Sequence, residues 1–314
     1  MKIDQIFQAR ERIAPYALTT PLIPLERLEE QLGFVPWVKL ENMQNMGAFK
    51  IRGAMNAVLK LSSDDRKKGL ITASSGNHGR AVALAAYQLG VPALIVLPNT
   101  VLELKRNAIE KLGAKTMLVE PQERLDIARQ IAREEGYSMI HPFDNEDVIA
   151  GQGTIGLEIL DQLPEVQNVF VPMGGGGLIS GIASAIKLLN PEVKVIGMEP
   201  AAVPKFSQNL KNTSPQAVAE RPSIADALLS NKPGQRPLEL VKKYVDEIIS
   251  VEEKPLKDAF RLLLEEGRIL AEPSSAITFG ALLQGSLDHL NLANSVFVIS
   301  GGNVSLEDIH RILK

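Results

Sequence analysis

The stretch NVFVPMGGGGLISGIASAIKLL, residues 168 to 189, decides the fold class. Its first six residues form an apolar run of β-branched and aromatic side chains, which is typical of a buried strand. Four consecutive glycines follow, Gly174 to Gly177. From Leu178 onward, apolar residues recur at the i, i+3 and i+4 spacing of a helix. A strand, a tight loop and a helix in direct succession predict an α/β fold.

The same pattern recurs along the chain. Further short apolar runs, each bounded by turn residues, cover residues 69–75, 92–99, 116–121, 193–200 and 295–302. Helical spacing lies between several of them. Alternation of nearly continuous apolar strands with helices is typical of parallel strands that are buried on both faces. We therefore predict doubly wound sheets in two domains, with the active site in the cleft between them. The large domain would comprise residues 1–67 and 145–314, and the small domain residues 68–144.

Composition excludes several classes of protein. The 314 residues are 45% hydrophobic and 23% charged, as in a soluble globular protein. The net charge of −3 and the 4% aromatic content argue against nucleic acid or an anionic membrane as a partner. The chain has no cysteine, which excludes disulfides and cysteine nucleophiles and fits a cytoplasmic location. Neither a secretory leader nor an apolar run of membrane-spanning length occurs.

The run of four glycines predicts an anion site. Without Cβ atoms the backbone can approach a ligand closely, and the following helix N-terminus offers unpaired N–H groups and a positive dipole end. A tight strand-to-helix turn is the alternative explanation. The dinucleotide pattern G-x-G-x-x-G fails because Ser180 stands at its third glycine, and no Gly-Lys-Ser/Thr of a Walker loop follows. A single phosphate on a smaller cofactor fits best.

Two other predicted strands end in similar loops, Ser74-Ser75-Gly76-Asn77-His78 and Ser300-Gly301-Gly302-Asn303. Ligands of open α/β sheets bind beyond the carboxyl ends of the strands. The three loops could therefore face one crevice. Lys50, in the stretch MQNMGAFKIRGA at residues 43 to 54, is a candidate reactive amine for that crevice.

Six motifs occur in a fixed order: FKIRGA, SSGNHG, GQGTIGLEIL, GGGGL, EPSSA and SGGN, between residues 49 and 303. In this order they make the chain resemble the pyridoxal-phosphate enzymes of the tryptophan-synthase β-like fold, also called fold type II. Within that fold the chain looks most like the group of serine/threonine dehydratases and serine racemases. The resemblance implies pyridoxal 5′-phosphate as cofactor and a homodimer as the usual assembly.

The resemblance also implies roles for individual residues. Lys50 matches the lysine that carries the cofactor and acts in catalysis, and Phe49 matches the aromatic residue beside the ring. Asn77 matches the amide that binds the 3′ oxygen, and Ser300 the hydroxyl at the ring nitrogen. The phosphate loop would consist of Gly174, Gly175, Gly176, Gly177 and the Leu178 N–H. Substrate binding would involve Ser74, Ser75, Gly76, Asn77, His78 and Arg124; a solvated helix charge is the alternative for Arg124.

The implied activity is a dehydratase, or ammonia-lyase, that converts L-threonine, L-serine or a related 3-hydroxy amino acid to a 2-oxo acid and ammonia. A lysine amine in a desolvated pocket has a lowered pKa and can act as nucleophile and general base. A serine at the ring nitrogen cannot keep it protonated as an aspartate would. This arrangement favours expulsion of a β-substituent over a long-lived carbanion.

Other functions stay open. Ser75 matches the second acid/base of serine racemases, which supports a racemase with β-elimination as side activity, whereas Phe143 is closer to dehydratases. A dehydratase of hydroxyaspartate or phenylserine type, or a non-catalytic binding protein on the same fold, is a further alternative. Met46 stands where the family usually has threonine, which puts activation by a nucleotide in doubt. Lys205, six residues after Glu199, leads us to expect no metal there.

Overall fold

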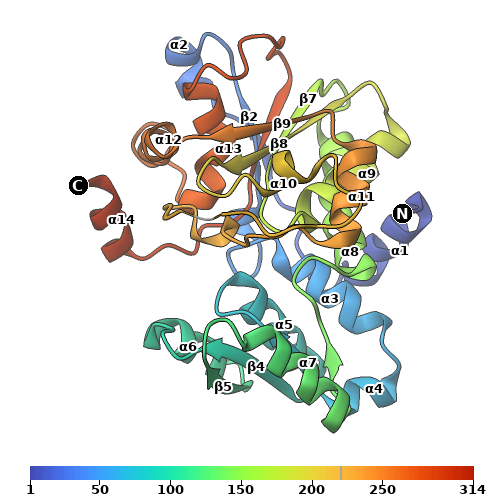
Figure 1. Cartoon of the computed structure of the whole chain (residues 1–314). Coiled ribbons are helices and arrows are strands. Elements are labelled where there is room, and N and C mark those ends of the chain that lie inside the picture. Colours follow the sequence, from blue (N-terminus) through green and yellow to red (C-terminus); the bar gives the residue numbers. More distant parts are fainter. Residues whose placement is uncertain (220) are drawn as a thin grey trace.

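Strands that were predicted from apolar runs assemble into two separate sheets (Figure 1). The chain is described by a computed structural model over residues 1–219 and 221–314. The six-stranded sheet has the order β1-β2-β10-β7-β8-β9 and the four-stranded sheet the order β5-β4-β3-β6. Neighbouring strands are parallel except for the antiparallel pair of β1 and β2. The strands of the large sheet are β1 (Leu22–Pro24), β2 (Trp37–Leu40), β7 (Asn168–Pro172), β8 (Lys194–Pro200), β9 (Glu247–Val251) and β10 (Ser295–Ile299). Those of the small sheet are β3 (Leu70–Ala73), β4 (Ala93–Pro98), β5 (Lys115–Val119) and β6 (Ser138–Met139).

Helices cover both faces of the large sheet. Along β7, Val169 and Val171 pack with α8, α9 and α11 on one face, whereas Phe170 packs with α12 and α13 on the other. The sheet is therefore doubly wound, as predicted. The helices of the large unit are α1 (Ile3–Ile13), α2 (Glu29–Leu32), α3 (Lys50–Lys60), α8 (Glu146–Gln162), α9 (Gly177–Leu189), α10 (Lys205–Asn209), α11 (Gln235–Tyr244), α12 (Glu253–Glu265), α13 (Pro273–Leu283) and α14 (Leu306–Leu313). Those of the small unit are α4 (Ser63–Lys68), α5 (Asn77–Leu89), α6 (Glu103–Glu110) and α7 (Arg124–Glu135).

All six strands predicted from the apolar runs are present, and four strands escaped prediction. β1 and β6 are only three and two residues long, too short for a periodic signal. β5 corrects the expectation of burial on both faces, because it lies at the sheet edge and its residues Lys115, Met117 and Leu118 are exposed. The small sheet spans residues 70–139, within the range proposed for the small domain, whose boundaries stay a proposal.

The first turn of α3 is tied to the end of β10. Phe49 N–H donates to the Ser300 carbonyl (3.1 Å), Gly302 N–H donates to the Gly47 carbonyl (2.8 Å), and Ala48 pairs with Gly301 in an antiparallel bridge. α3 itself lies between the two units in Figure 1 and packs against α5 and α8. The residue that begins α3 therefore sits where both sheets meet. Within the described ranges, no helix combines the length and the hydropathy needed to cross a membrane.

Candidate functional site

Lys50 is the first residue of α3. Its Nζ donates to the Pro142 carbonyl (3.0 Å), on the segment that follows the small sheet, and lies 5.0 Å from the centre of the Phe49 ring. Desolvation lowers the pKa of Lys50 to about 8, against an opposing effect of the Glu272 charge. A substantial fraction of the amine is therefore neutral near pH 8 and able to act as a nucleophile or base.

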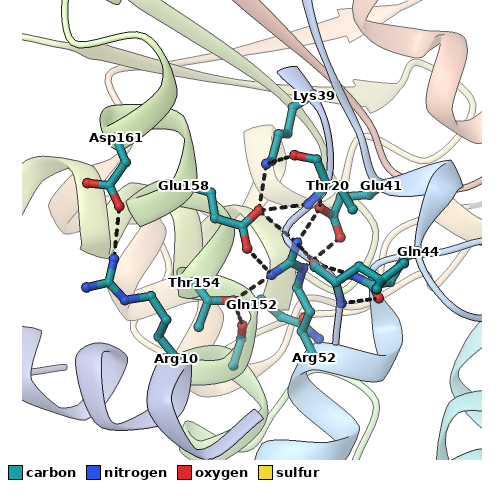
Figure 2. A network of polar contacts seen from close by, with 12 residues as sticks. Arg10, Thr20, Lys39, Glu41, Gln44, Arg52, Gln152, Thr154, Glu158 and Asp161 are labelled. Atoms are coloured by element: carbon teal, nitrogen blue, oxygen red, sulfur yellow. Dashed lines mark hydrogen bonds and ion pairs between the residues drawn. The ribbon is translucent and has the colours of Figure 1, made fainter. Parts of the chain in front are cut away.

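Arg52, two residues further along α3, belongs to a buried network of charges (Figure 2). Its guanidinium contacts Glu41 (Nε to Oε2, 2.8 Å) and Glu158 (Nη1 to Oε1, 2.6 Å), and Glu158 also pairs with Lys39 (2.6 Å). The interpretation of Arg52 as a structural ion-pair residue is thereby confirmed. Glu41 follows β2 and Glu158 lies on α8, so the network holds the first turn of α3 against both.

The four glycines lie between β7 and α9, as predicted. Gly176 caps α9 with a left-handed φ of +96°. A Cβ on Gly175 would lie 2.2 Å from the Phe143 ring, and one on Gly176 would lie 2.4 Å from Phe206. Packing therefore demands these glycines in addition to any ligand. The loop carries no side chain, so the N–H groups at the N-terminus of α9 are open to an anion.

Asn77 joins the loops of the two sheets. Its Nδ2 donates to both carboxylate oxygens of Glu272 (2.8 and 3.1 Å), and its Oδ1 accepts from Asn303 Nδ2 (2.8 Å). Asn303 also donates to Glu272 through its backbone N–H (2.9 Å) and to the Met46 carbonyl through Nδ2 (2.9 Å). Desolvation raises the pKa of Glu272 to about 7. Glu272 and Asn303 are site residues that the sequence offered only as parts of the motifs EPSSA and SGGN.

Ser300 lies at the end of β10 and is nearly buried. Its Oγ is 2.9 Å from Ser275 Oγ, and either hydroxyl can donate. The structure thus brings Lys50, Asn77 and Ser300 to one region: Phe49 binds the Ser300 carbonyl, and Glu272 links Asn77 to the segment after Ser300.

The predicted substrate residues divide into two groups. Ser74, Ser75 and Gly76 are partly exposed just before the N-terminus of α5, where they are accessible to a ligand. His78 is buried, and its Nε2 contacts the Ile140 carbonyl (2.9 Å); desolvation lowers its pKa to about 3, with the Lys50 charge adding to the effect. A neutral His78 offers no charge to a carboxylate. Arg124 begins α7 and donates to the Pro121 carbonyl (2.8 Å), so its described contact is local and does not bring it to Lys50.

Lys205 begins α10 and is fully buried. Its Nζ donates to the Leu228 carbonyl (2.9 Å), and desolvation lowers its pKa to about 8, opposed by the charge of Glu199. Glu199 accepts from the N–H groups of Phe206 and Ser207 (2.8 and 2.9 Å). An ammonium group thus links Glu199 and α10 to the segment at Leu228.

A family model described as "Pyridoxal-phosphate dependent enzyme" matches residues 13–301. The chain belongs to this family of pyridoxal-phosphate-dependent enzymes. The cofactor implied by the sequence motifs is thereby confirmed, as is the fold.

Relatives within the pyridoxal-phosphate family cover nearly the whole chain. An L-threonine ammonia-lyase from Thermotoga maritima is 42% identical over 313 residues, which are 99% of this chain and 78% of the relative. A serine racemase structure from Dictyostelium discoideum is 36% identical, with a TM-score of 0.90 and coverage of 98% of this chain and 99% of that chain. The crystal structure of a bacterial-type threonine deaminase, from the source abbreviated T.th., is also 36% identical, with a TM-score of 0.91 and the same coverage.

The residues present fit pyridoxal phosphate. A side-chain-free loop at a helix N-terminus suits the phosphate, the amine of Lys50 with its lowered pKa suits the aldehyde, and the amide of Asn77 and the hydroxyl of Ser300 suit the polar atoms of the ring. These four functions come from α3, α5, α9 and the end of β10.

Proposed function

We propose that this pyridoxal-phosphate enzyme is an ammonia-lyase that converts L-threonine, L-serine or a related 3-hydroxy amino acid to a 2-oxo acid and ammonia. The observation that carries the proposal is Lys50, an amine with a pKa near 8 at the junction of both sheets. The full-length similarity to an L-threonine ammonia-lyase supports the reaction and the substrate class.

Bound pyridoxal phosphate supplies an electron-accepting ring that stabilises the charge left by removal of a Cα proton. Lys50 Nζ removes that proton as the general base, because desolvation keeps much of the amine neutral near pH 8. The N–H groups of Gly174 to Leu178 hold the phosphate. Backbone and hydroxyl groups of Ser74 to Asn77 hold the substrate carboxylate and so orient the Cα–H bond.

Serine racemisation is the second candidate function, and Ser75 is the observation that favours it. Ser75 is partly exposed in the loop before α5, where a substrate would meet it, and the similarity to a serine racemase structure supports the idea. Racemisation needs a proton donor on the face of Cα opposite Lys50. If Ser75 is that donor, Ser75→Ala will abolish formation of D-serine and leave release of the 2-oxo acid; equal loss of both activities would exclude the role.

The test of the main proposal is a panel of L- and D-3-hydroxy amino acids, assayed for both the 2-oxo acid and the opposite enantiomer. We expect turnover of L-threonine or L-serine to 2-oxobutyrate or pyruvate with equimolar ammonia. Enzyme that is loaded with pyridoxal phosphate and turns over no member of the panel would contradict the proposal. Conversion of L-serine to D-serine faster than to pyruvate would favour the racemase.

Three further assignments complete the proposal: a cytoplasmic location, a homodimer, and Arg124 as a substrate contact. The resemblance to the family supports the homodimer, and the absence of cysteine from the sequence fits the cytoplasm. Light scattering during size-exclusion chromatography tests the assembly, with a mass of twice 34.2 kDa expected for the dimer.

A further inference from the structure

Two buried hydroxyl groups meet where the ring nitrogen of the cofactor is proposed to lie. Ser275, in the first turn of α13, is fully buried, and Ser300, at the end of β10, is nearly so. Ser275 Oγ has three polar neighbours, each 2.9 Å away: the backbone N–H and the carbonyl of Gly301, and Ser300 Oγ. Ser275 is the one hydroxyl of the pair that is enclosed by protein on all these sides.

The hydrogens of this group can be arranged in two ways. The Gly301 N–H can only donate and the Gly301 carbonyl can only accept. If Ser275 donates to the carbonyl, Ser300 must donate to Ser275 and can present only lone pairs to the cleft. If Ser275 donates to Ser300, the hydrogen of Ser300 is free to point into the cleft. The single hydrogen of Ser275 therefore determines whether Ser300 acts as donor or acceptor.

The second arrangement leaves no buried group unsatisfied. The Gly301 carbonyl also accepts from the Glu272 N–H (2.8 Å), so it keeps a partner when Ser275 turns away. A hydroxyl that accepts one hydrogen bond becomes a better donor of the next. Ser300 is therefore prepared to donate to an unprotonated nitrogen, and it would lose this preparation without Ser275.

We propose that Ser275 is a positioning residue that holds Ser300 as a hydrogen-bond donor to the ring nitrogen of pyridoxal phosphate and thereby keeps that nitrogen unprotonated. The proposal rests on the placement of Ser300 in the proposed function. Ser275 does not touch the cofactor; it acts through Ser300 alone. The pair gives this chain a way to weaken the ring as an electron sink, which suits elimination of a β-substituent.

The experiment measures the ¹⁵N chemical shift of ring-labelled pyridoxal phosphate bound to the substrate-free enzyme. In the wild type we expect the shift of a neutral nitrogen that accepts a hydrogen bond. Ser300→Ala should move the shift toward that of a neutral nitrogen without a donor, and Ser275→Ala should move it in the same direction by a smaller amount. The double variant should match Ser300→Ala, because Ser275 acts only through Ser300.

Ser274→Ala is the matched control. Ser274 lies next to Ser275 in the same turn, is equally buried and accepts a hydrogen bond from the Ala227 N–H (3.0 Å). Its loss removes one buried hydrogen bond but leaves Ser275 and Ser300 in place. We expect the ¹⁵N shift of Ser274→Ala to equal that of the wild type even if thermal stability falls as much as in Ser275→Ala.

The outcomes separate the two levels of the argument. A wild-type shift in Ser275→Ala, with a changed shift in Ser300→Ala, overturns the role of Ser275 only. A wild-type shift in Ser300→Ala removes the placement of Ser300 itself. If Ser275→Ala does not fold or bind the cofactor, Ser275→Cys replaces it, and its weak thiol donor should give an intermediate shift. The wild-type spectrum is decisive without any variant, because a protonated ring nitrogen would contradict the proposal.

Discussion

At the scale of single residues, Lys50 and Glu272 share one desolvated region, and burial favours the neutral form of each. It lowers the pKa of Lys50 to about 8 and raises that of Glu272 to about 7. Near pH 7 to 8 both groups are therefore close to gaining or losing a proton. This is a property of catalytic sites, and here it rests on named contacts: Glu272 accepts from Asn77 and Asn303.

Glu272 makes the stability of the cofactor-free protein depend on pH. Below pH 4.5 the carboxyl is protonated in both states; between 4.5 and about 7 the unfolded chain ionises it while the folded chain retains the proton. Stability attributable to Glu272 should therefore fall as pH rises through this window, by at most about 3 kcal/mol. We expect urea unfolding to show this fall in the wild type and not in Glu272→Gln. Parallel pH profiles of the two proteins would contradict the shift.

The residue scale also shows where sequence reasoning ends. Lys50, Asn77 and the four glycines could be proposed because each stands in a motif with a family counterpart. The bond from Asn303 to Asn77 joins residues 226 positions apart, and the Ser275 and Ser300 hydroxyls are 25 positions apart. No pattern of periodicity or spacing encodes such pairs, since they arise only when two loops of the folded chain meet.

At the scale of elements, the network around Arg52 fixes α3. The charges of Arg52, Glu41, Glu158 and Lys39 are almost completely removed from water, so each needs its partner. Burial alone would raise the pKa of Glu41, but the charge and hydrogen bonds of Arg52 hold it below its usual value. The ion pairs of Arg52 therefore determine how the helix that carries Lys50 is held.

Arg52→Ala leaves two buried carboxylates without their cation. We expect it to lower the free energy of unfolding by about 3–5 kcal/mol, measured by urea denaturation. Arg10→Ala is the control, because the pair of Arg10 with Asp161 is of similar length (2.9 Å) but has side chains that are 45% and 68% exposed (Figure 2). Its cost should stay below about 1 kcal/mol. Similar losses in both variants would show that burial of the network is unimportant.

The glycine loop gives a second prediction for an element. A Cβ at position 175 would meet the Phe143 ring at 2.2 Å, so Gly175→Ala must displace the loop or the ring. We expect at least about a tenfold weaker binding of pyridoxal phosphate, which corresponds to about 1.4 kcal/mol, measured by fluorescence titration. Phe143→Ala in the same chain should restore part of the affinity. Unchanged binding in Gly175→Ala would argue against this loop as the phosphate site.

At the scale of the whole molecule, the proposed cofactor site is assembled from both sheets. Asn77 belongs to the unit of the small sheet, whereas Glu272 and Asn303 belong to that of the large sheet (Figure 1). The sequence predicted two doubly wound sheets with a site between them because strand ends and glycine loops alternate along the chain. It could not predict the pairing of β1 with β2 or the place of the two-residue β6, since strands this short depend on neighbours supplied by the fold.

Asn303→Ala tests this joint. It removes donors to the Asn77 side chain and to the Met46 carbonyl, both across loops that face the site. We expect a higher KM for substrate and weaker cofactor binding, each by about fivefold to tenfold, with a smaller change in stability. Asn42→Ala is a comparison, because Asn42 donates a single bond to the Leu270 carbonyl (3.0 Å). Equal effects of the two substitutions on KM would mean that the contact with Asn77 has no special role.

Attachment of the cofactor to Lys50 is the central claim, and it can be measured directly. The protein is incubated with pyridoxal phosphate, reduced with borohydride, digested and mapped by mass spectrometry, with Lys50→Ala treated in parallel. The account predicts the reduced cofactor on Lys50 and its absence from the variant, together with loss of ammonia release from L-threonine and L-serine. Cofactor found on a different lysine, or full activity in Lys50→Ala, would contradict it.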